Sequence, residues 1–234
     1  MFISHKHKCI FVHIPKTAGS SVHRALVEKM HPELDKSMLQ RFSDIPIKKS
    51  NTSLMAVYEL SADGIYIKRG HDGIITTKKN LKGTMLESYI NKYFTFCFVR
   101  NPWDRFVSAH AHLIDRRRRG PELPYKTFND FILGNIRSEK IHTKLLKQLH
   151  FEPQYKYILD SNNNINIDFI GRFENLHEDF DIICKKIGIK TPKLRHNNKS
   201  HHKSYQTYYT DKTAEIIYNA YKEDIDYFDY SFNF

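Results

Sequence analysis

The sequence contains few cysteines and no long apolar run, and both absences exclude classes of protein. The three cysteines, Cys9, Cys97 and Cys184, are widely separated. Two fall in predicted core strands and one on a predicted amphipathic helix, so we interpret them as buried thiols rather than disulfide partners or metal ligands. No apolar stretch has the length of a transmembrane helix, and residues 1–8 lack the apolar segment of a secretory signal. We therefore expect a cytoplasmic protein, either free or held peripherally at the inner face of the membrane.

Acidic residues are scarce relative to basic ones. The chain has 37 Lys and Arg against 26 Asp and Glu, which gives a net charge of +11 and favours anionic partners. Nucleic acid is the ordinary partner of a basic protein, but helix-turn-helix, zinc-finger and aromatic RNA-binding signatures are all missing. A polyanionic nucleotide or an acidic glycan explains the charge equally well, and we predict no nucleic-acid partner. The densest basic run, 116–119, is either a solvated helix end or a patch that attracts an anionic acceptor or a membrane surface.

Linkers and internal repeats are also missing, so the 234 residues predict one domain over 1–234. The pattern predicts strands at 8–13, 65–68, 93–99, 155–159 and 167–171. It predicts helices at 19–30, within 83–92, at 102–118, near 127–134 and 138–149, at 174–187 with Gly188 as the cap, and at 210–222 before an aromatic tail. Strands that alternate with helices predict an α/β fold with a mostly parallel, P-loop-like central sheet flanked by helices.

The segment 11–22 holds the most informative motif. The apolar run Cys9–Val12 stops at a proline, and helix-compatible sequence follows, which predicts a strand, a tight turn and a helix start. Such a turn directs several backbone N–H groups and the positive end of the helix dipole at one point, and so forms a phosphate site. Lys16 adds a mobile charge. Lys16 precedes Gly19, so the chain lacks the Gly-x4-Gly-Lys order of ordinary ATPases and kinases. The hydroxyl donors in the turn are Thr17, Ser20 and Ser21.

A second motif of the same kind follows the predicted strand 93–99. Arg100 stands at the carboxyl end of that strand, and Ser108 lies about two turns into the next helix. Ligands of open α/β sheets bind outside the carboxyl ends of the strands. Two strand-to-helix junctions, each with a cation and hydroxyl groups, therefore predict a ligand with two anionic ends.

These motifs resemble those of a known family. The Pro-Lys-Thr-Ala-Gly-Ser-Ser turn at 15–21 resembles the 5′-phosphosulfate loop of sulfotransferases, and the segment 98–108 resembles their 3′-phosphate motif. The nearest resemblance is to the carbohydrate sulfotransferases, which include the Golgi chondroitin and heparan enzymes and bacterial relatives. Further similar segments follow in the family's order at 150–154, 168–176, 196–205, 208–211 and 226–230. The resemblance implies the sulfotransferase fold, the donor 3′-phosphoadenosine 5′-phosphosulfate, no metal, and a hydroxyl acceptor on a carbohydrate or glycolipid.

The resemblance also assigns roles to residues. Lys16 neutralises the charge that develops on the leaving 5′ phosphate, and Arg100 and Ser108 hold the 3′ phosphate. Ser200 and Lys203 close over the 3′ phosphate or the adenine. The residues expected to hold the 5′ phosphate and the sulfonate are Lys16, Thr17, Ala18, Gly19, Ser20 and Ser21.

A hydroxyl acceptor requires a general base, and histidine is the commonest choice. The resemblance points to His71, which precedes the second motif at the family's spacing. A solvated loop histidine is the alternative interpretation of His71. His13, next to the phosphate turn, is the rival base, although a role in orienting the turn suits it better. His150 is expected to line the acceptor cleft.

Two other functions stay open from the sequence. A nucleotide-dependent kinase would need an acidic partner after a second strand, whereas the strand at 93–99 ends in Arg100. A non-enzymatic basic module would bind nucleic acid or an anionic glycan with steep salt dependence. The identity of the acceptor and the oligomeric state have no readable signal in the sequence.

Overall fold

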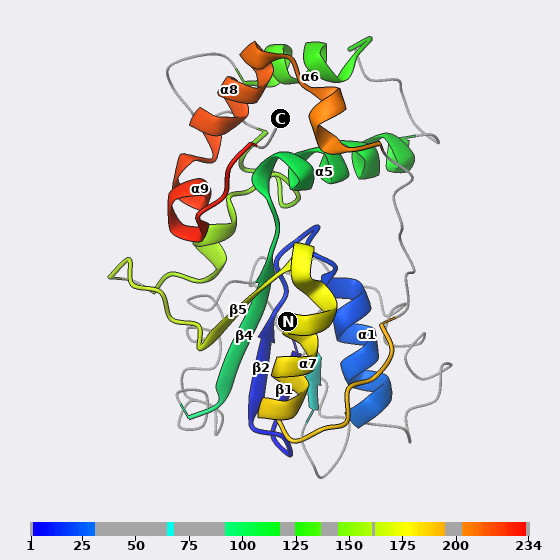
Figure 1. Ribbon diagram of the computed structural model, residues 1–234, viewed down its shortest axis with the longest axis vertical. Helices are drawn as coiled ribbons and strands as arrows, with labels where there is room; N and C mark the ends of the chain where they lie inside the picture. Colours follow the sequence, from blue (N-terminus) through cyan, green and yellow to red (C-terminus); the bar gives the residue numbers. More distant parts are fainter. Residues whose placement is uncertain are drawn as a thin grey trace, which may run out of the picture.

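The computed structural model describes residues 2–30, 65–67, 92–117, 125–136, 145–160, 162–194 and 203–232. Within these ranges five strands form one sheet in the order β3-β1-β2-β4-β5 (Figure 1). β2 pairs in parallel with β4, and β4 in parallel with β5, whereas β1 runs antiparallel to both of its neighbours. The predicted mostly parallel sheet is therefore confirmed. The strands are β1 (Phe2–Ser4), β2 (Cys9–Val12), β3 (Ile65–Ile67), β4 (Phe94–Val99) and β5 (Phe169–Arg172).

Both faces of the sheet are covered, as a parallel sheet requires. Successive residues of β4 alternate between two apolar clusters: Phe96 and Phe98 pack with the buried faces of α1 (Gly19–Met30) and α7 (Leu176–Lys186). Cys97 and Val99 belong to the cluster on the opposite face. This alternation is the two-residue period of a strand buried on both sides. The predicted burial of the three free cysteines is confirmed.

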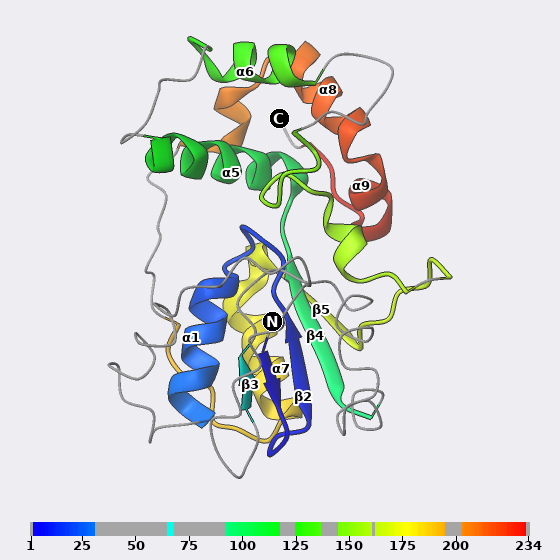
Figure 2. The ribbon, with the colours of Figure 1, turned by 180° about the vertical axis from the view of Figure 1, so that it is seen from behind.

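A layer of helices lies beyond the carboxyl end of β4, where the chain passes directly into α5 (Figure 2). Its core is aromatic and centres on Trp103, Phe106, Phe131 and Tyr221. The turn after β2, and the residues that join β4 to α5, thus lie between the sheet and this layer. The helices of the layer are α5 (Pro102–Arg117), α6 (Phe128–Asn135), α8 (Asp211–Ala220) and α9 (Lys222–Phe228).

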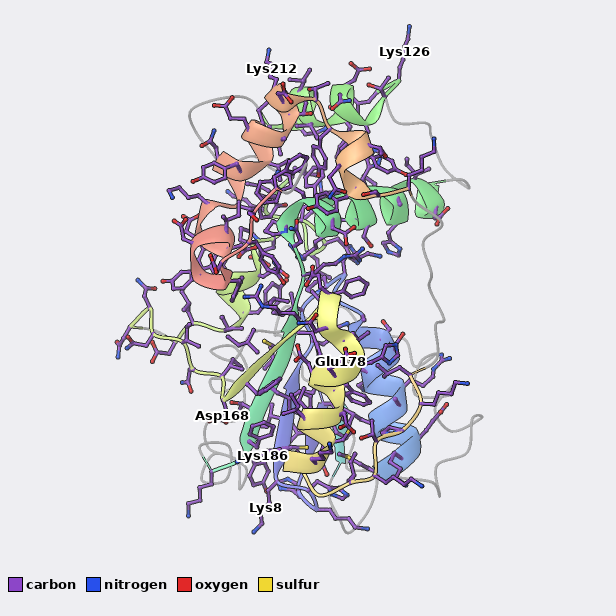
Figure 3. All side chains as sticks on the ribbon, in the orientation of Figure 1. Lys8, Lys126, Asp168, Glu178, Lys186 and Lys212 are labelled. Atoms are coloured by element: carbon purple, nitrogen blue, oxygen red, sulfur yellow. The ribbon has the colours of Figure 1, made fainter. Side chains whose placement is uncertain are left out.

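Basic side chains occupy both ends of the molecule. Lys8 and Lys186 lie at the end of the sheet away from the helical layer, and Lys126 and Lys212 lie at the far edge of that layer (Figure 3). These four lysines are therefore remote from the strand-end turns. Among the described helices, none combines the length and apolar character needed to cross a membrane.

The helix predicted at 174–187 is confirmed as α7, with a 3-10 turn, η2 (Phe173–Asn175), before it. Gly188, the predicted cap, has φ of 73°. The amide of Gly188 donates to the carbonyl of Lys185, and the amide of Ile189 donates to the carbonyl of Cys184. This pair of bonds is a Schellman motif, which satisfies the last carbonyls of the helix.

Three predictions about elements were wrong. The strand expected at 155–159 is instead a 3-10 helix, η1 (Gln154–Tyr157), and Leu159 alone pairs as an isolated bridge to Ile165. The buried carboxylate of Asp224 accepts the amides of Gln154 and Tyr155, which are then not available to a strand ladder.

The other two concern helix boundaries. Residues 145–150 of the helix expected near 138–149 form turns. The aromatic tail expected after residue 222 is a separate helix, α9. The helical conformation is interrupted at Tyr221, and Asp224 on α9 points inward toward η1. β1 was not predicted, since a strand of three residues carries too little pattern. The helix expected within 83–92 lies outside the described residues, apart from Lys92.

Candidate functional site

The turn after β2 has the backbone of an anion-binding nest. Lys16 and Ala18 have φ of 70° and 64°, a left-handed conformation that non-glycine residues adopt rarely, while Thr17 between them does not. Alternation of this kind turns successive N–H groups toward one point. The amides of Lys16, Thr17 and Ala18 donate to no backbone carbonyl within the described residues.

Side chains inside the turn hold this conformation. Thr17 is completely buried, and its hydroxyl donates to the carbonyl of Ile14 at 3.0 Å, so its hydrogen serves the turn itself. The amide of Ser21 donates to the carbonyl of Ala18 at 2.9 Å as α1 begins. The side chain of Ser20 is exposed and that of Ser21 is half-buried.

His13 packs directly on the start of α1. A Cβ atom added to Gly19 would lie 1.8 Å from Cδ2 of His13, so only glycine leaves room for the imidazole. The ring also stacks on Phe11, with centroids 5.8 Å apart and planes inclined by 16°. These contacts suit a residue that orients the turn, which was the preferred role for His13.

Arg100 continues the line of β4 and is 5 % exposed. Its Nε donates to Oδ2 of Asp104, four residues further along the chain, at 2.8 Å, and its Nη2 lies 2.8 Å from the same oxygen in a salt bridge. Nη1 donates to the main-chain carbonyl of Lys16 at 3.3 Å, and the guanidinium carbon lies 4.0 Å from the centre of the Phe173 ring. Three of the five N–H donors of Arg100 are thus used, and two are unassigned within the described residues.

A second contact between the sheet and the helical layer comes from Arg105, which is 1 % exposed. Its Nε donates to the carbonyl of Pro15 at 2.9 Å, and its Nη2 donates to the carbonyl of Glu152 at 2.8 Å. Arg105 therefore fixes α5 over the turn that contains Lys16. On the same helix, Ser108 is 5 % exposed, and no hydrogen bond joins its hydroxyl to another described residue.

Positive charge is concentrated at the meeting point of the two turns. Burial, together with the nearby charges of Arg100 and Arg105, lowers the pKa of Lys16 from 10.5 to about 8, against the opposing effect of Asp115. A cation that is partly desolvated beside two other cations gains from an anionic ligand. The electrostatics therefore agree with the predicted anion site.

The structure brings together most of the predicted site residues. Lys16 to Ser21 and Arg100 meet at the carboxyl ends of β2 and β4, and Ser108 follows on α5. Lys203 is exposed and precedes η3 (Tyr205–Tyr208), whose Tyr205 hydroxyl accepts a bond from Nδ2 of Asn101. His71 and Ser200 lie outside the described residues.

Some residues of the site were missed from the sequence. Phe173, under the guanidinium of Arg100, directly follows β5, so the rule used for β2 and β4 applied to it equally. His112 lies four residues after Ser108 and therefore shares its helix face. The His112 ring lies 4.7 Å from the ring of His150, the predicted acceptor-cleft residue.

The described side chains include no group of three or more His, Cys, Asp or Glu placed to hold a metal ion.

Comparison of the sequence with known proteins identifies its family. The sulfotransferase family model matches residues 1–231. Human carbohydrate sulfotransferase 9 is 23% identical over an alignment of 262 positions, which covers 99% of this chain but 53% of the human protein, so the chain spans about half of that relative. An uncharacterized protein of Archaeoglobus fulgidus is 35% identical over 97 residues, 42% of this chain and 69% of that protein. No solved structure matched the chain. With the family match extending over almost every residue, and with both strand-end turns in place, the chain belongs to the sulfotransferase family.

Proposed function

We propose that this protein transfers a sulfuryl group from 3′-phosphoadenosine 5′-phosphosulfate to a hydroxyl of a carbohydrate or glycolipid acceptor. The observation that carries the proposal is the hydrogen bond from Nη1 of Arg100 to the carbonyl of Lys16, which joins the two phosphate-binding turns into one site. A donor with phosphates at both ends of one nucleoside requires two cationic turns at this separation. The residues present fit such a donor.

The turn after β2 would hold the sulfated end of the donor. The amides around Lys16, Thr17 and Ala18 form the nest, and the start of α1 adds the positive end of its dipole. The ammonium group of Lys16 would neutralise the charge left on the 5′ phosphate as the bond from its bridging oxygen to sulfur breaks. The hydroxyl groups of Ser20 and Ser21 would add donors to the sulfonate.

The turn after β4 would hold the 3′ phosphate. Arg100 has two N–H donors beyond those given to Asp104 and Lys16, and a pair of N–H groups suits two phosphate oxygens. The buried hydroxyl of Ser108 is the second predicted donor. Ser200 and Lys203 are proposed to close over the adenine or the 3′ phosphate.

The transfer itself needs alignment and a base. The acceptor oxygen forms a bond to sulfur, the bond from sulfur to the bridging phosphate oxygen breaks, and the acceptor proton passes to a base. His71 is the proposed base and His13 its rival. The donor supplies both the sulfuryl group and the leaving phosphate, so these side chains position and stabilise charge rather than react covalently.

The acceptor class is proposed from the human relative and from the charge of this chain. The human relative is named for carbohydrate sulfation, and the high positive charge of this chain suits an anionic glycan. A cytoplasmic location, free or peripheral at a membrane, is part of the same proposal.

The first experiment is calorimetric titration of the protein with adenosine 3′,5′-bisphosphate and, separately, with adenosine 5′-phosphate. The proposal requires saturable binding of the bisphosphate and a clear preference for it over the monophosphate. Absence of that preference would count against the assignment of Arg100. A mass-shift assay with the sulfated donor and a panel of glycans, glycolipids and small alcohols then identifies the acceptor.

A further inference from the structure

The carboxamide of Gln154 continues the sheet where β4 ends. The amide of Arg100 donates to Oε1 of Gln154 at 2.9 Å, and Nε2 of Gln154 donates to the carbonyl of Arg100 at 2.9 Å. The side chain of Gln154 thus pairs with the Arg100 backbone in both directions, as a neighbouring strand would. It comes from a segment 54 residues further along the chain.

Gln154 is itself fixed by a buried carboxylate. Oδ2 of Asp224 accepts the amide of Gln154 at 2.8 Å and Nε2 of the same residue at 3.3 Å, while Oδ1 accepts the amide of Tyr155 at 2.8 Å. Gln154 and Asp224 are both 0 % exposed. The carboxylate fixes the orientation of the Gln154 amide, because Nε2 must lie on the side of Asp224, which leaves Oε1 to accept from the Arg100 amide.

These contacts bear on one part of the site. Val99 is the last residue of β4 that pairs with β5, so the Arg100 backbone lies just beyond the ladder. The Arg100 side chain is held separately by Asp104 and Phe173. Loss of Gln154 would leave a buried N–H and a buried C=O of Arg100 without these partners, and the backbone would have to move to recover them.

We propose that Gln154 and Asp224 are positioning residues that set the preference of the site for a 3′-phosphorylated nucleotide. They act through the Arg100 backbone and make no contact with the ligand in this role. The turn around Lys16 has its own supports in Thr17 and Arg105, so binding at the 5′ end does not depend on this pair. The inference rests on the proposed function, because it takes Arg100 as the 3′-phosphate residue.

The test is the ratio of the dissociation constants of adenosine 5′-phosphate and adenosine 3′,5′-bisphosphate, measured by calorimetry. Gln154→Met keeps the side-chain volume and removes both bonds to Arg100. We expect it to weaken bisphosphate binding about tenfold, the usual scale for a disturbed charge-assisted contact, while the monophosphate constant changes less than about twofold. The exposed Gln148 lies in the same segment, and Gln148→Met should leave both constants unchanged.

Two further variants separate positioning from general stability. Asp224→Asn keeps the shape but replaces one acceptor oxygen with an NH2 group, so in either orientation the amide of Gln154 or that of Tyr155 loses its acceptor. The ratio should therefore shift in the same direction even if Gln154→Met fails to fold. In an Arg100→Ala background, Gln154→Met should shift the ratio no further. Equal weakening of both ligands, or full additivity with Arg100→Ala, overturns the inference. A wild-type protein without preference for the bisphosphate contradicts the proposed function instead.

Discussion

The Nη1 atom of Arg100 donates a hydrogen bond to the main-chain carbonyl of Lys16 across 3.3 Å. Placement of these residues on remote faces would have excluded a single ligand between them. Their contact instead brings the turns after β2 and β4 together at one edge of the sheet. A nucleotide held there would contact both cations.

The pH dependence of binding should follow Lys16. Because burial and the neighbouring arginines lower its pKa to about 8, Lys16 is mostly charged at pH 7 and mostly neutral at pH 9. Affinity for the bisphosphate should therefore fall roughly tenfold between pH 7 and pH 9, with proton uptake on binding near pH 8. Calorimetry in buffers of different ionisation enthalpy measures both quantities. Lys16→Arg should remove the slope, and a slope that persists in this variant assigns the titration to another group.

Gly19→Ala should disturb the turn through His13. The new Cβ would fall on the imidazole, so the ring must leave its stack on Phe11 or α1 must shift. We expect a loss of about 1–3 kcal/mol in the free energy of unfolding, read from thermal or urea denaturation. The double variant with His13→Ala removes the clash and should recover much of this loss. A double variant no more stable than Gly19→Ala would mean that the backbone, not the ring, limits the substitution.

Phe173 should contribute to the 3′-phosphate end through the guanidinium of Arg100. Phe173→Leu keeps an apolar side chain but removes the ring face that lies 4.0 Å from the guanidinium carbon. A cation–π contact of about 0.5–2 kcal/mol predicts a loss of about two- to thirtyfold in bisphosphate affinity. The exposed Tyr218 on α8 offers a matched control, and Tyr218→Leu should have no effect. Unchanged affinity in Phe173→Leu would show that Asp104 alone orients the arginine.

The base can be separated from the donor site by two variants. His71→Ala should abolish sulfuryl transfer and leave bisphosphate affinity within about twofold, because a base contacts the acceptor rather than the nucleotide. Lys16→Ala should abolish transfer and also weaken nucleotide binding by about one to two decades. Calorimetry and the mass-shift assay give the two readouts. Retained transfer in His71→Ala moves the base role to His13 or another group.

The two strand-turn-helix units could be predicted because each is contiguous in the sequence. The apolar runs Cys9–Val12 and Phe94–Val99 are bounded by proline-containing turns, and the helices that follow have regular apolar spacing. The residues of the phosphate turn and Arg100 could be assigned from the same local patterns. The contact between Lys16 and Arg100 requires β2 and β4 to be neighbours in the sheet. The sequence predicts a mostly parallel sheet but does not predict the order of its strands.

The segments that the sequence did not predict depend on partners far along the chain. The region 155–159 has the composition of a strand. The carboxylate of Asp224, however, accepts the amides of Gln154, 70 residues before it, and of Tyr155. The proposed role of Gln154 cannot be predicted from the neighbouring sequence either, because a glutamine after a proline has no strong preference for one secondary structure. Phe173 is different, because it directly follows β5, and the rule that ligands bind beyond the carboxyl ends of parallel strands points to it from the sequence.

The Arg100–Lys16 contact joins positions 84 residues apart. Closing so long a loop costs conformational entropy that is recovered only when β2 and β4 pair, and non-local parallel pairing is a slow step in folding. We therefore expect the site to form only together with the pairing of β2 and β4. A refolding intermediate that lacks the β2–β4 pairing has no place for the nucleotide, so the ligand stabilises the finished native state and no earlier species.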